Sequence, residues 1–283
     1  MKIGLDSYTY HRYFGEVYDV QTKPENQLNV FGFLQKAASF DVDGVSLESC
    51  FLPEFGESFL RELKDRLKES GLEIAYAWGH PAGLKGGTDP EALDEMIQHI
   101  EYARFLGSPV MRVVGNNGRY RFDEHEKQID RLSKMFSKAI PWAEKQGVKL
   151  AIENHLDYTF EELMTLVENV DSPFFGITYD SGNCVRIQDD PVAGIQKALP
   201  RIFATHLKDL RLDKNISFNR WQYYACASFG TGGVDLEKII KTLESSGYSG
   251  MYTIEIDYLH TDFQQNEDKA VAESIEYLRG LKI

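Results

Sequence analysis

The amino-acid sequence predicts an α/β fold, a single (β/α)8 TIM barrel domain over residues 1–283. Short apolar runs of strand length alternate eight times with longer segments of helical period, and no linker or low-complexity segment interrupts them. A chain of 283 residues can bury the large core of such a barrel. The predicted strands are KIGLDSY (2–8), GVSLES (44–49), EIAYAWG (73–79), VMRVVG (110–115), KLAIENH (149–155), FFGITYD (174–180), IFATHLKD (202–209) and MYTIEID (251–257).

Apolar side chains recur at helical spacing between these strands, as expected for helices that cover a barrel. Asp89 and Pro90 form an N-cap and first helical position, and glycines follow several helical runs where a left-handed C-cap is needed. An open doubly wound sheet is the rival fold, but no GxGxxG motif follows the first strand. The helical faces are Leu93/Ile97/Ile100/Ala103, Ile129/Leu132/Phe136/Ile140/Ala143 and Leu236/Ile239/Ile240/Leu243, and the glycines are Gly71, Gly107, Gly147 and Gly247.

The composition fits a globular enzyme that acts on a small molecule. Hydrophobic residues make up 42% and charged residues 27%, which is ordinary for such a protein. The formal net charge is −13, from 44 acidic and 31 basic residues, so the phosphates of a nucleic acid would be repelled. We therefore expect no nucleic-acid partner.

The cysteines and the hydrophobic runs favour a cytoplasmic location. Cys50, Cys184 and Cys226 are widely spaced without a CxxC pair, which indicates no disulfide framework. Asp6 lies within what would have to be the apolar core of a signal peptide. Because no run of about 18 apolar residues occurs, we expect no membrane-spanning segment.

Four predicted strands in the second half each end near one metal-ligand side chain. The runs LAIENH, FFGITYD, FATHLKD and MYTIEID place these residues at separations of 27, 26 and 49. In a barrel the carboxyl ends of neighbouring parallel strands share one rim, where active sites of this fold lie. Three carboxylates and one imidazole suit Mn²⁺, our preferred ion, and also Mg²⁺, Co²⁺ or Zn²⁺. The predicted ligands are Glu153, Asp180, His206 and Glu255.

Several motifs carry a resemblance to a known family. IENH (152–155), YDSGN (179–183), HLKD (206–209), GTGGVDL (230–236) and YTIEID (252–257) resemble the xylose-isomerase-like TIM-barrel superfamily of sugar isomerases and epimerases. The resemblance implies that the same Glu, Asp, His, Glu quartet holds Mn²⁺ or a similar ion and that a carbohydrate completes the coordination. Ketose 3-epimerases of this family tend to have a histidine three residues after the metal aspartate, where this chain has Asn183.

Other polar residues at the same rim are candidates for contact with the substrate. His155 and Lys208 each lie two residues after a predicted ligand, so strand periodicity points them to the same side. Lys208 could polarise a carbonyl, or it could form a salt bridge with Asp209 or with a neighbouring strand end. Asn183 and His80 complete the set at this rim, and Glu48 lies at the end of the second strand. For His80 and Glu48, anchoring of a loop is the alternative.

A long loop is predicted over residues 210–230, between the seventh strand and its helix. It combines Trp221, Tyr223 and Tyr224 with Arg211 and Arg220, of which Arg220 is a further candidate for substrate contact. Such a loop is either a lid over a hydrophilic ligand or a contact in a homo-oligomer. The GTGG run at 230–233 could bind a phosphate at the start of the next helix or form a structural turn.

Our first hypothesis is a metal-dependent isomerase or epimerase of a ketose or keto-sugar that works through an enediolate. Glu153 and Glu255 would remove and return the proton, since two carboxylates can act on opposite faces of the substrate. The alternative is a lyase or dehydratase of a keto-sugar or keto-polyol, in which the same enediolate expels a leaving group. Seven histidines and the charge of −13 argue against an apurinic-site endonuclease, and a non-catalytic sugar-binding barrel is the fourth hypothesis.

Overall fold

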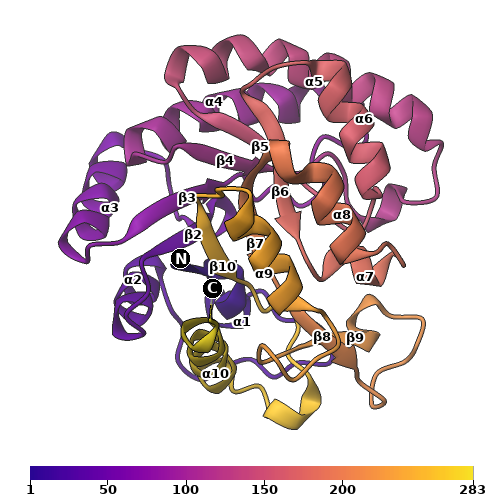
Figure 1. Cartoon of the computed structure of the whole chain (residues 1–283). Coiled ribbons are helices and arrows are strands. Elements are labelled where there is room, and N and C mark those ends of the chain that lie inside the picture. Colours follow the sequence, from indigo (N-terminus) through magenta and orange to yellow (C-terminus); the bar gives the residue numbers. More distant parts are fainter. Residues whose placement is uncertain (283) are drawn as a thin grey trace.

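The computed structural model describes residues 1–282 and contains the closed barrel that the sequence predicts (Figure 1). Its eight parallel strands are hydrogen-bonded in the order β1-β10-β7-β6-β5-β4-β3-β2, so that the first strand pairs with the last. All eight predicted strands are confirmed, although most end one to three residues earlier than predicted. They are β1 (Lys2–Asp6), β2 (Gly44–Glu48), β3 (Glu73–Ala77), β4 (Val110–Val113), β5 (Lys149–Glu153), β6 (Phe175–Asp180), β7 (Ile202–Leu207) and β10 (Met251–Ile254).

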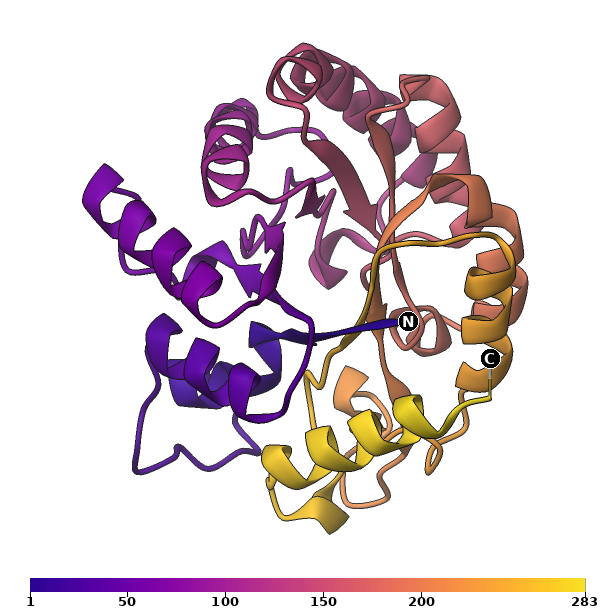
Figure 2. The ribbon, with the colours of Figure 1, turned by 60° about the vertical axis from the view of Figure 1, so that its left-hand side comes forward.

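A ring of helices surrounds the strands, and the two chain ends lie close together (Figure 2). The predicted caps are present: Asp89 accepts a hydrogen bond from the amide of Ala92 at 3.1 Å, and Gly107 and Gly147 adopt left-handed φ values of 90° and 67°. No helix within residues 1–282 is long and apolar enough to cross a lipid bilayer. The helices are α1 (His11–Phe14), α2 (Val30–Ser39), α3 (Glu57–Glu69), α4 (Pro90–Leu106), α5 (His125–Gln146), α6 (Phe160–Val170), α7 (Asn183–Arg186), α8 (Pro191–Ala198), α9 (Leu236–Ser245) and α10 (Glu267–Gly280).

Small and apolar side chains form a floor beneath the candidate site. Ala151 and Ala204 each lie two residues before a predicted metal ligand, so they point to the same side of their strands. They form one buried cluster with Ala75, Val110 and Met251. This floor fills the barrel interior below the carboxyl ends of the strands, where the candidate site lies.

A register shift between β6 and β7 sets which residue of β7 faces Asp180. Ile177 pairs with Ile202, but the next pair is Thr178 with Ala204, so β7 carries one extra residue at this point. The shift places His206 directly opposite Asp180. Without it, continuous pairing would place a threonine there, because a slip of one residue turns every side chain to the other face.

The predicted loop over residues 210–230 is partly wrong. Its first and last parts pair as an antiparallel two-stranded sheet, β8 (Asp209–Leu212) and β9 (Tyr224–Ala227). Each strand has four residues, too short to show a clear strand period in the sequence. An amide-to-carbonyl bond of 2.7 Å from Cys226 to Tyr258 holds the sheet to the segment after β10. Contacts with a segment distant in the sequence therefore hold this two-stranded sheet in place.

Candidate metal centre

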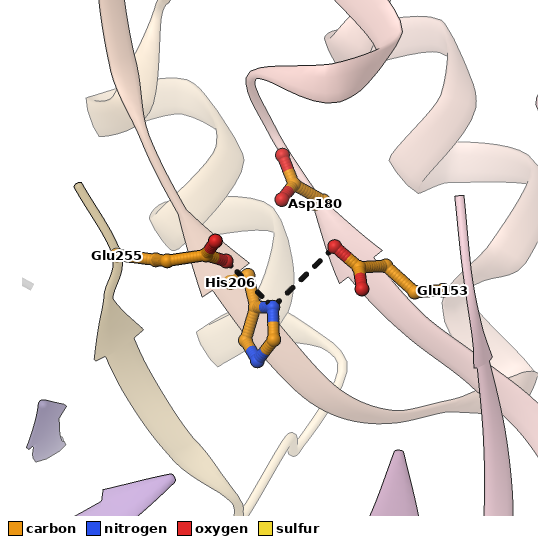
Figure 3. A group of neighbouring side chains, drawn as sticks. All are labelled: Glu153, Asp180, His206 and Glu255. Carbon is orange, nitrogen blue, oxygen red and sulfur yellow. Dashed lines mark ion pairs between the residues drawn. The ribbon is translucent and has the colours of Figure 1, made fainter. Parts of the chain in front are cut away.

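The four predicted metal ligands converge at the carboxyl ends of neighbouring strands. Glu153 ends β5, Asp180 ends β6, His206 lies in β7, and Glu255 follows directly after β10. One oxygen or nitrogen atom from each lies within 4.8 Å of the others, and all four side chains are buried. Figure 3 shows the four side chains pointing toward one another from their separate strands. Residues 102 positions apart in the sequence thus share one small volume.

His206 is the centre of this group. Its Nδ1 atom lies 2.7 Å from a Glu255 oxygen and 3.5 Å from a Glu153 oxygen, as the dashed lines in Figure 3 indicate. Its Nε2 atom lies 3.4 Å from Asp6 Oδ2. A metal-binding histidine usually gives its second ring N–H to a carboxylate, which fixes the tautomer and aims the free nitrogen at the ion. Asp6 is in the position for this role.

The donor atoms fit a divalent cation. Within residues 1–282, His206 Nδ1 and Glu255 Oε2 are buried atoms without a hydrogen-bond partner, although they lie only 2.7 Å apart. A cation between them would satisfy both, because an imidazole nitrogen and a carboxylate oxygen each offer it a lone pair. Three carboxylates with one imidazole suit Mn²⁺, Mg²⁺ or Zn²⁺. The residues present therefore fit the ion that the sequence predicts.

Lys208 places a buried ammonium group at the edge of the cluster. Its Nζ atom contacts Asp180 and lies 3.0 Å from Glu255 and 3.4 Å from Asp257. Burial lowers the pKa of Lys208, but these carboxylates outweigh burial and hold the pKa well above its ordinary value. The sequence predicted a salt bridge with Asp209 or with a neighbouring strand end, and the structure shows the second, since Asp180 ends β6. Successive residues of an extended strand point to opposite sides, and Asp209 accepts hydrogen bonds from backbone amides instead.

Arg112 on β4 holds Glu153 in place. Its guanidinium contacts Glu153 through two nitrogens and lies 3.3 Å from Glu48. Burial raises the pKa of Glu153, but Arg112 and His206 outweigh it and keep that pKa well below its usual range. Sequence reasoning missed Arg112, although a charged residue inside an otherwise apolar strand could have signalled it. Glu48, which was predicted at this rim, belongs to the same charged group through its contact with Arg112.

Asn183 joins two of the predicted ligands. Its side-chain amide donates to Glu153 at 3.1 Å and to Asp180 at 3.0 Å. Arg186, at the end of α7, donates to the side-chain oxygen Oδ1 of Asn183 at 3.2 Å and forms a two-point ion pair with Asp257. The sequence predicted Asn183 at the site but missed Arg186 and Asp257, because α7 is only four residues long and the pairing crosses from β6 to β10.

The remaining predicted residues lie in three different settings. His155 is close to the cluster, and its buried Nδ1 atom has no hydrogen-bond partner within the described residues. His80 stacks on Trp78 with ring centres 5.0 Å apart. Arg220 lies outside the cluster and pairs with Asp19 at 2.8 Å, with both side chains partly exposed. The structure thus brings His155 close to the four predicted ligands and places Arg220 at the surface.

The profile of the xylose isomerase-like TIM barrel family matches residues 34–281. The chain belongs to this family.

Similar proteins carry out more than one type of reaction. An inosose dehydratase of Clostridium perfringens is 26% identical over 251 residues, covering 79% of this chain and 80% of that protein. A crystal structure of the IolI protein with a bound zinc atom has a TM-score of 0.75 at 18% identity, over 98% of this chain and 96% of that one. A structure of an L-ribulose 3-epimerase has a TM-score of 0.73 at 16% identity, over 98% and 93% of the two chains. At these identities the two structures show a shared fold.

Proposed function

We propose that this protein is a divalent-metal-dependent isomerase or epimerase of a ketose or keto-sugar. One observation carries the proposal: Glu153 and Glu255 approach the same nitrogen of His206 from different strands, at 3.5 and 2.7 Å. Two carboxylates placed around one cation are what an enzyme needs to remove a proton beside a carbonyl and return it on the other face. Family membership and the epimerase among the similar structures support this proposal.

The bound ion, for which we propose Mn²⁺, would supply a Lewis acid that draws electrons from the substrate carbonyl and stabilises an enediolate. Glu153, Asp180, His206 and Glu255 would hold it. Glu153 and Glu255 each retain a carboxylate, since neighbouring cations offset burial and lower both pKa values. One of the two would accept the α-proton. The other, which is also ionised, would first take a proton from water and then deliver it to the opposite face.

Three further side chains would orient the substrate and stabilise its charge. Lys208 remains protonated, so it can donate a hydrogen bond to an oxygen that becomes negative in the enediolate. His155 offers a buried ring nitrogen that has no hydrogen-bond partner among the described residues. Asn183 fixes the relative positions of Glu153 and Asp180, because its amide donates to both.

A dehydratase of a keto-sugar or keto-polyol is the second candidate. The resemblance to inosose dehydratases favours it, and so does the buried ammonium of Lys208, 3.0 Å from Glu255. In this reaction a carboxylate removes the α-proton, and the enediolate expels a β-hydroxyl as water after Lys208 donates a proton to it. The first half of the reaction is identical in the two candidates.

A deuterium-exchange screen tests both candidates. Ketoses, keto-sugars and cyclic polyol ketones are incubated with the protein and Mn²⁺ in D₂O, and substrate deuteration and product mass are measured. Exchange with an unchanged carbon skeleton and no loss of water indicates an isomerase or epimerase, whereas loss of 18 mass units (one H₂O) indicates a dehydratase. Binding without any exchange, retained in Glu153→Gln, would indicate a sugar-binding protein.

A further inference from the structure

Glu48 faces the candidate metal centre from β2, on the side of the barrel opposite Asp180. Three strands separate β2 from β6 in either direction around the barrel. Ser46, two residues before Glu48, points to the same side of β2, and its hydroxyl lies 3.5 Å from Nε2 of His206. Because a strand rises about 3.3 Å per residue, Glu48 lies about 7 Å further along the strand than Ser46. Glu48 therefore lies between the depth of His206 and the rim from which a substrate enters.

Only one oxygen of the Glu48 carboxyl has a hydrogen-bond partner within residues 1–282. Oε2 accepts from Arg112 at 3.3 Å. Arg112 lies closer to Glu153, which it contacts through two nitrogens, so its charge acts mainly on Glu153. A Cβ atom added at Gly79 would lie 2.6 Å from the same Oε2 atom. Among the described residues no backbone amide donates to Glu48, so no contact supports the predicted anchoring of a loop, and Oε1 is available for a ligand.

Glu48 is uncharged at neutral pH. Burial raises the pKa of Glu48 from 4.5 to about 8, although Arg112 opposes the rise. The remaining charged neighbours act in opposite directions: Asp6 on β1 raises the pKa of Glu48, His206 on β7 lowers it, and Glu153 on β5 raises it. A buried carboxyl with one distant cation and two nearby carboxylates keeps its proton, because ionisation would add a third negative charge.

The other titratable neighbours of Glu48 are neutral. Burial raises the pKa values of the Cys50 thiol and the Tyr76 hydroxyl above their ordinary range, and both groups interact with Glu48. Among the described residues Arg112 is the one cation in contact with the Glu48 side chain. Glu48 therefore lacks a partner of its own that would hold it ionised.

The charge of the buried group is balanced when one carboxyl stays protonated. Three protein cations and a divalent ion supply five positive charges for six carboxyl groups. The three carboxylates among the predicted ligands must be ionised to hold the ion. The cations are Arg112, Arg186 and Lys208, and the carboxyl groups are Asp6, Glu48, Glu153, Asp180, Glu255 and Asp257.

Two of the three other carboxyl groups are ionised at neutral pH. Burial raises the pKa of Asp257, but Arg186 and Lys208 outweigh burial and hold that pKa below its usual range. Burial raises the pKa of Asp6 only to about 6. Glu48 is the remaining carboxyl, and charge balance assigns the proton to it.

We infer that Glu48 contacts the substrate as a neutral carboxylic acid and donates a hydrogen bond to a substrate oxygen from the β2 side of the barrel. Lys208 would donate from β7, so two donors approach the substrate from different strands. A neutral acid stabilises an oxygen that gains negative charge, whereas an ionised carboxylate would repel it. This inference rests on the proposed function, because the oxygen concerned belongs to the enediolate of that reaction.

The pH dependence of exchange provides the first test. With the Mn²⁺-loaded protein and a sugar found active in the D₂O screen, kcat/KM for α-proton exchange is measured between about pH 6 and 9, because kcat/KM reports ionisations of the free enzyme. In the parent it should fall about tenfold per pH unit above pH 8, since Glu48 then loses the proton that it donates.

Two substitutions separate the donor from a structural role. Glu48→Ala removes the donor and should lower kcat/KM by about 10²–10³-fold at pH 7. Glu48→Gln keeps an N–H donor that does not titrate, so it should recover all but about tenfold of the loss at pH 7 and should not show the fall above pH 8. Glu62→Gln, an exposed glutamate on α3, is the matched control and should keep the parental profile.

These profiles decide the inference without deciding the proposed function. If Glu48→Gln retains the parental fall above pH 8, or is as impaired at pH 7 as Glu48→Ala, the inference is overturned while exchange by the parent leaves the proposed function standing.

Infrared difference spectra of the parent and Glu48→Gln provide a readout that does not depend on turnover. At pH 7 the parent should show the C=O band of a protonated carboxylic acid, which disappears as the pH rises through 8 and is missing from Glu48→Gln. The band should shift when D-fructose or 2-keto-myo-inositol binds to the Mn²⁺-loaded protein, with binding monitored as a rise in Tm.

The infrared result also decides the inference if the screen fails. Absence of α-proton exchange with every sugar counts against the proposed function alone. A band that is missing at pH 7, or that stays unchanged with a sugar that raises the Tm, overturns the inference, and a shifted band supports it.

Discussion

Glu153 and Glu255 are held in different ways, although both were predicted as proton carriers. Arg112 and Asn183 bind the two oxygens of Glu153 separately, which restrains this side chain on both sides. Glu255 has one buried oxygen with no hydrogen-bond partner within residues 1–282, close to His206 and Lys208. At this oxygen, Glu255 is therefore held by the nearby charges of His206 and Lys208.

Replacement of either glutamate by glutamine should lower turnover by about 10²–10⁴-fold, the usual effect of losing a positioned acid or base. One variant should still exchange the α-proton with solvent, because the remaining glutamate can remove and return it on its own face. Net conversion should fail in both. Exchange and conversion are measured separately with metal content confirmed, and Glu62→Gln, an exposed glutamate on α3, serves as control. Near-parental conversion in both variants would contradict this assignment and indicate that Lys208 or His155 transfers the proton.

Asp6 gives a second prediction at the residue scale. Asp6→Asn should weaken metal binding by about 10–100-fold, because the amide can no longer orient and polarise His206 as the carboxylate does. Metal titration followed by calorimetry measures the affinity. Asp43→Asn is the control, since Asp43 accepts from the amide of Ile3 at the other end of β1. Unchanged affinity in Asp6→Asn would show that the contact with His206 is not functional.

At the scale of the secondary-structure elements, the ion pair between Arg186 and Asp257 connects α7 to the segment that follows β10. Both side chains are buried, so Arg186→Met should destabilise the protein by about 3–5 kcal/mol by leaving Asp257 with too little positive charge around it. Arg211→Met is the comparison: Arg211 pairs with the exposed Asp262 at 2.8 Å, and its loss should cost less than about 1 kcal/mol. Denaturant unfolding gives both values, and equal losses would contradict the argument.

The packing of α4 on β3 should depend on pH through His99. Its Nδ1 atom lies 2.7 Å from the Tyr76 hydroxyl, and burial lowers the pKa of His99 to about 4. The pKa of His99 in the folded protein is below its unfolded value of about 6.5. The free energy of unfolding is therefore unaffected by His99 above pH 6.5 and decreases as the pH falls from 6.5 toward 4. Between pH 7 and 5 the loss should be about 2 kcal/mol.

His99→Gln isolates this contribution, since glutamine can still accept a hydrogen bond from Tyr76 but does not titrate. Unfolding free energies of parent and variant are compared at pH 7 and pH 5. The difference between the two proteins should shrink at the lower pH, and a constant difference would assign the acid sensitivity to other groups.

At the scale of the whole molecule, one ion would connect β5, β6, β7 and β10. Manganese at about 100 times its dissociation constant should stabilise the folded state by about 2.7 kcal/mol, or roughly 5–10 °C in Tm. His206→Ala should lose most of this shift, whereas His99→Gln should keep it. Equal shifts in His206→Ala and the parent would place metal binding elsewhere. Lys208 and Arg112 contact three of the four predicted ligands, so they offset part of the repulsion among these carboxylates when no metal is bound.

The sequence by itself determined the barrel and the four candidate ligands. Strand and helix periods are local properties, and parallel strands bring their carboxyl ends to one rim, so Glu153, Asp180, His206 and Glu255 could be placed together from their spacing.

Only the tertiary structure decided what surrounds these four residues. Closure pairs β1 with β10, which brings Asp6 to His206 across 200 residues, and no local pattern encodes such a contact. The register shift that sets His206 opposite Asp180 depends on how two strands pack. Asp209 binds the amides before α9 for a similar reason: segments separated in the sequence meet only after the barrel has closed.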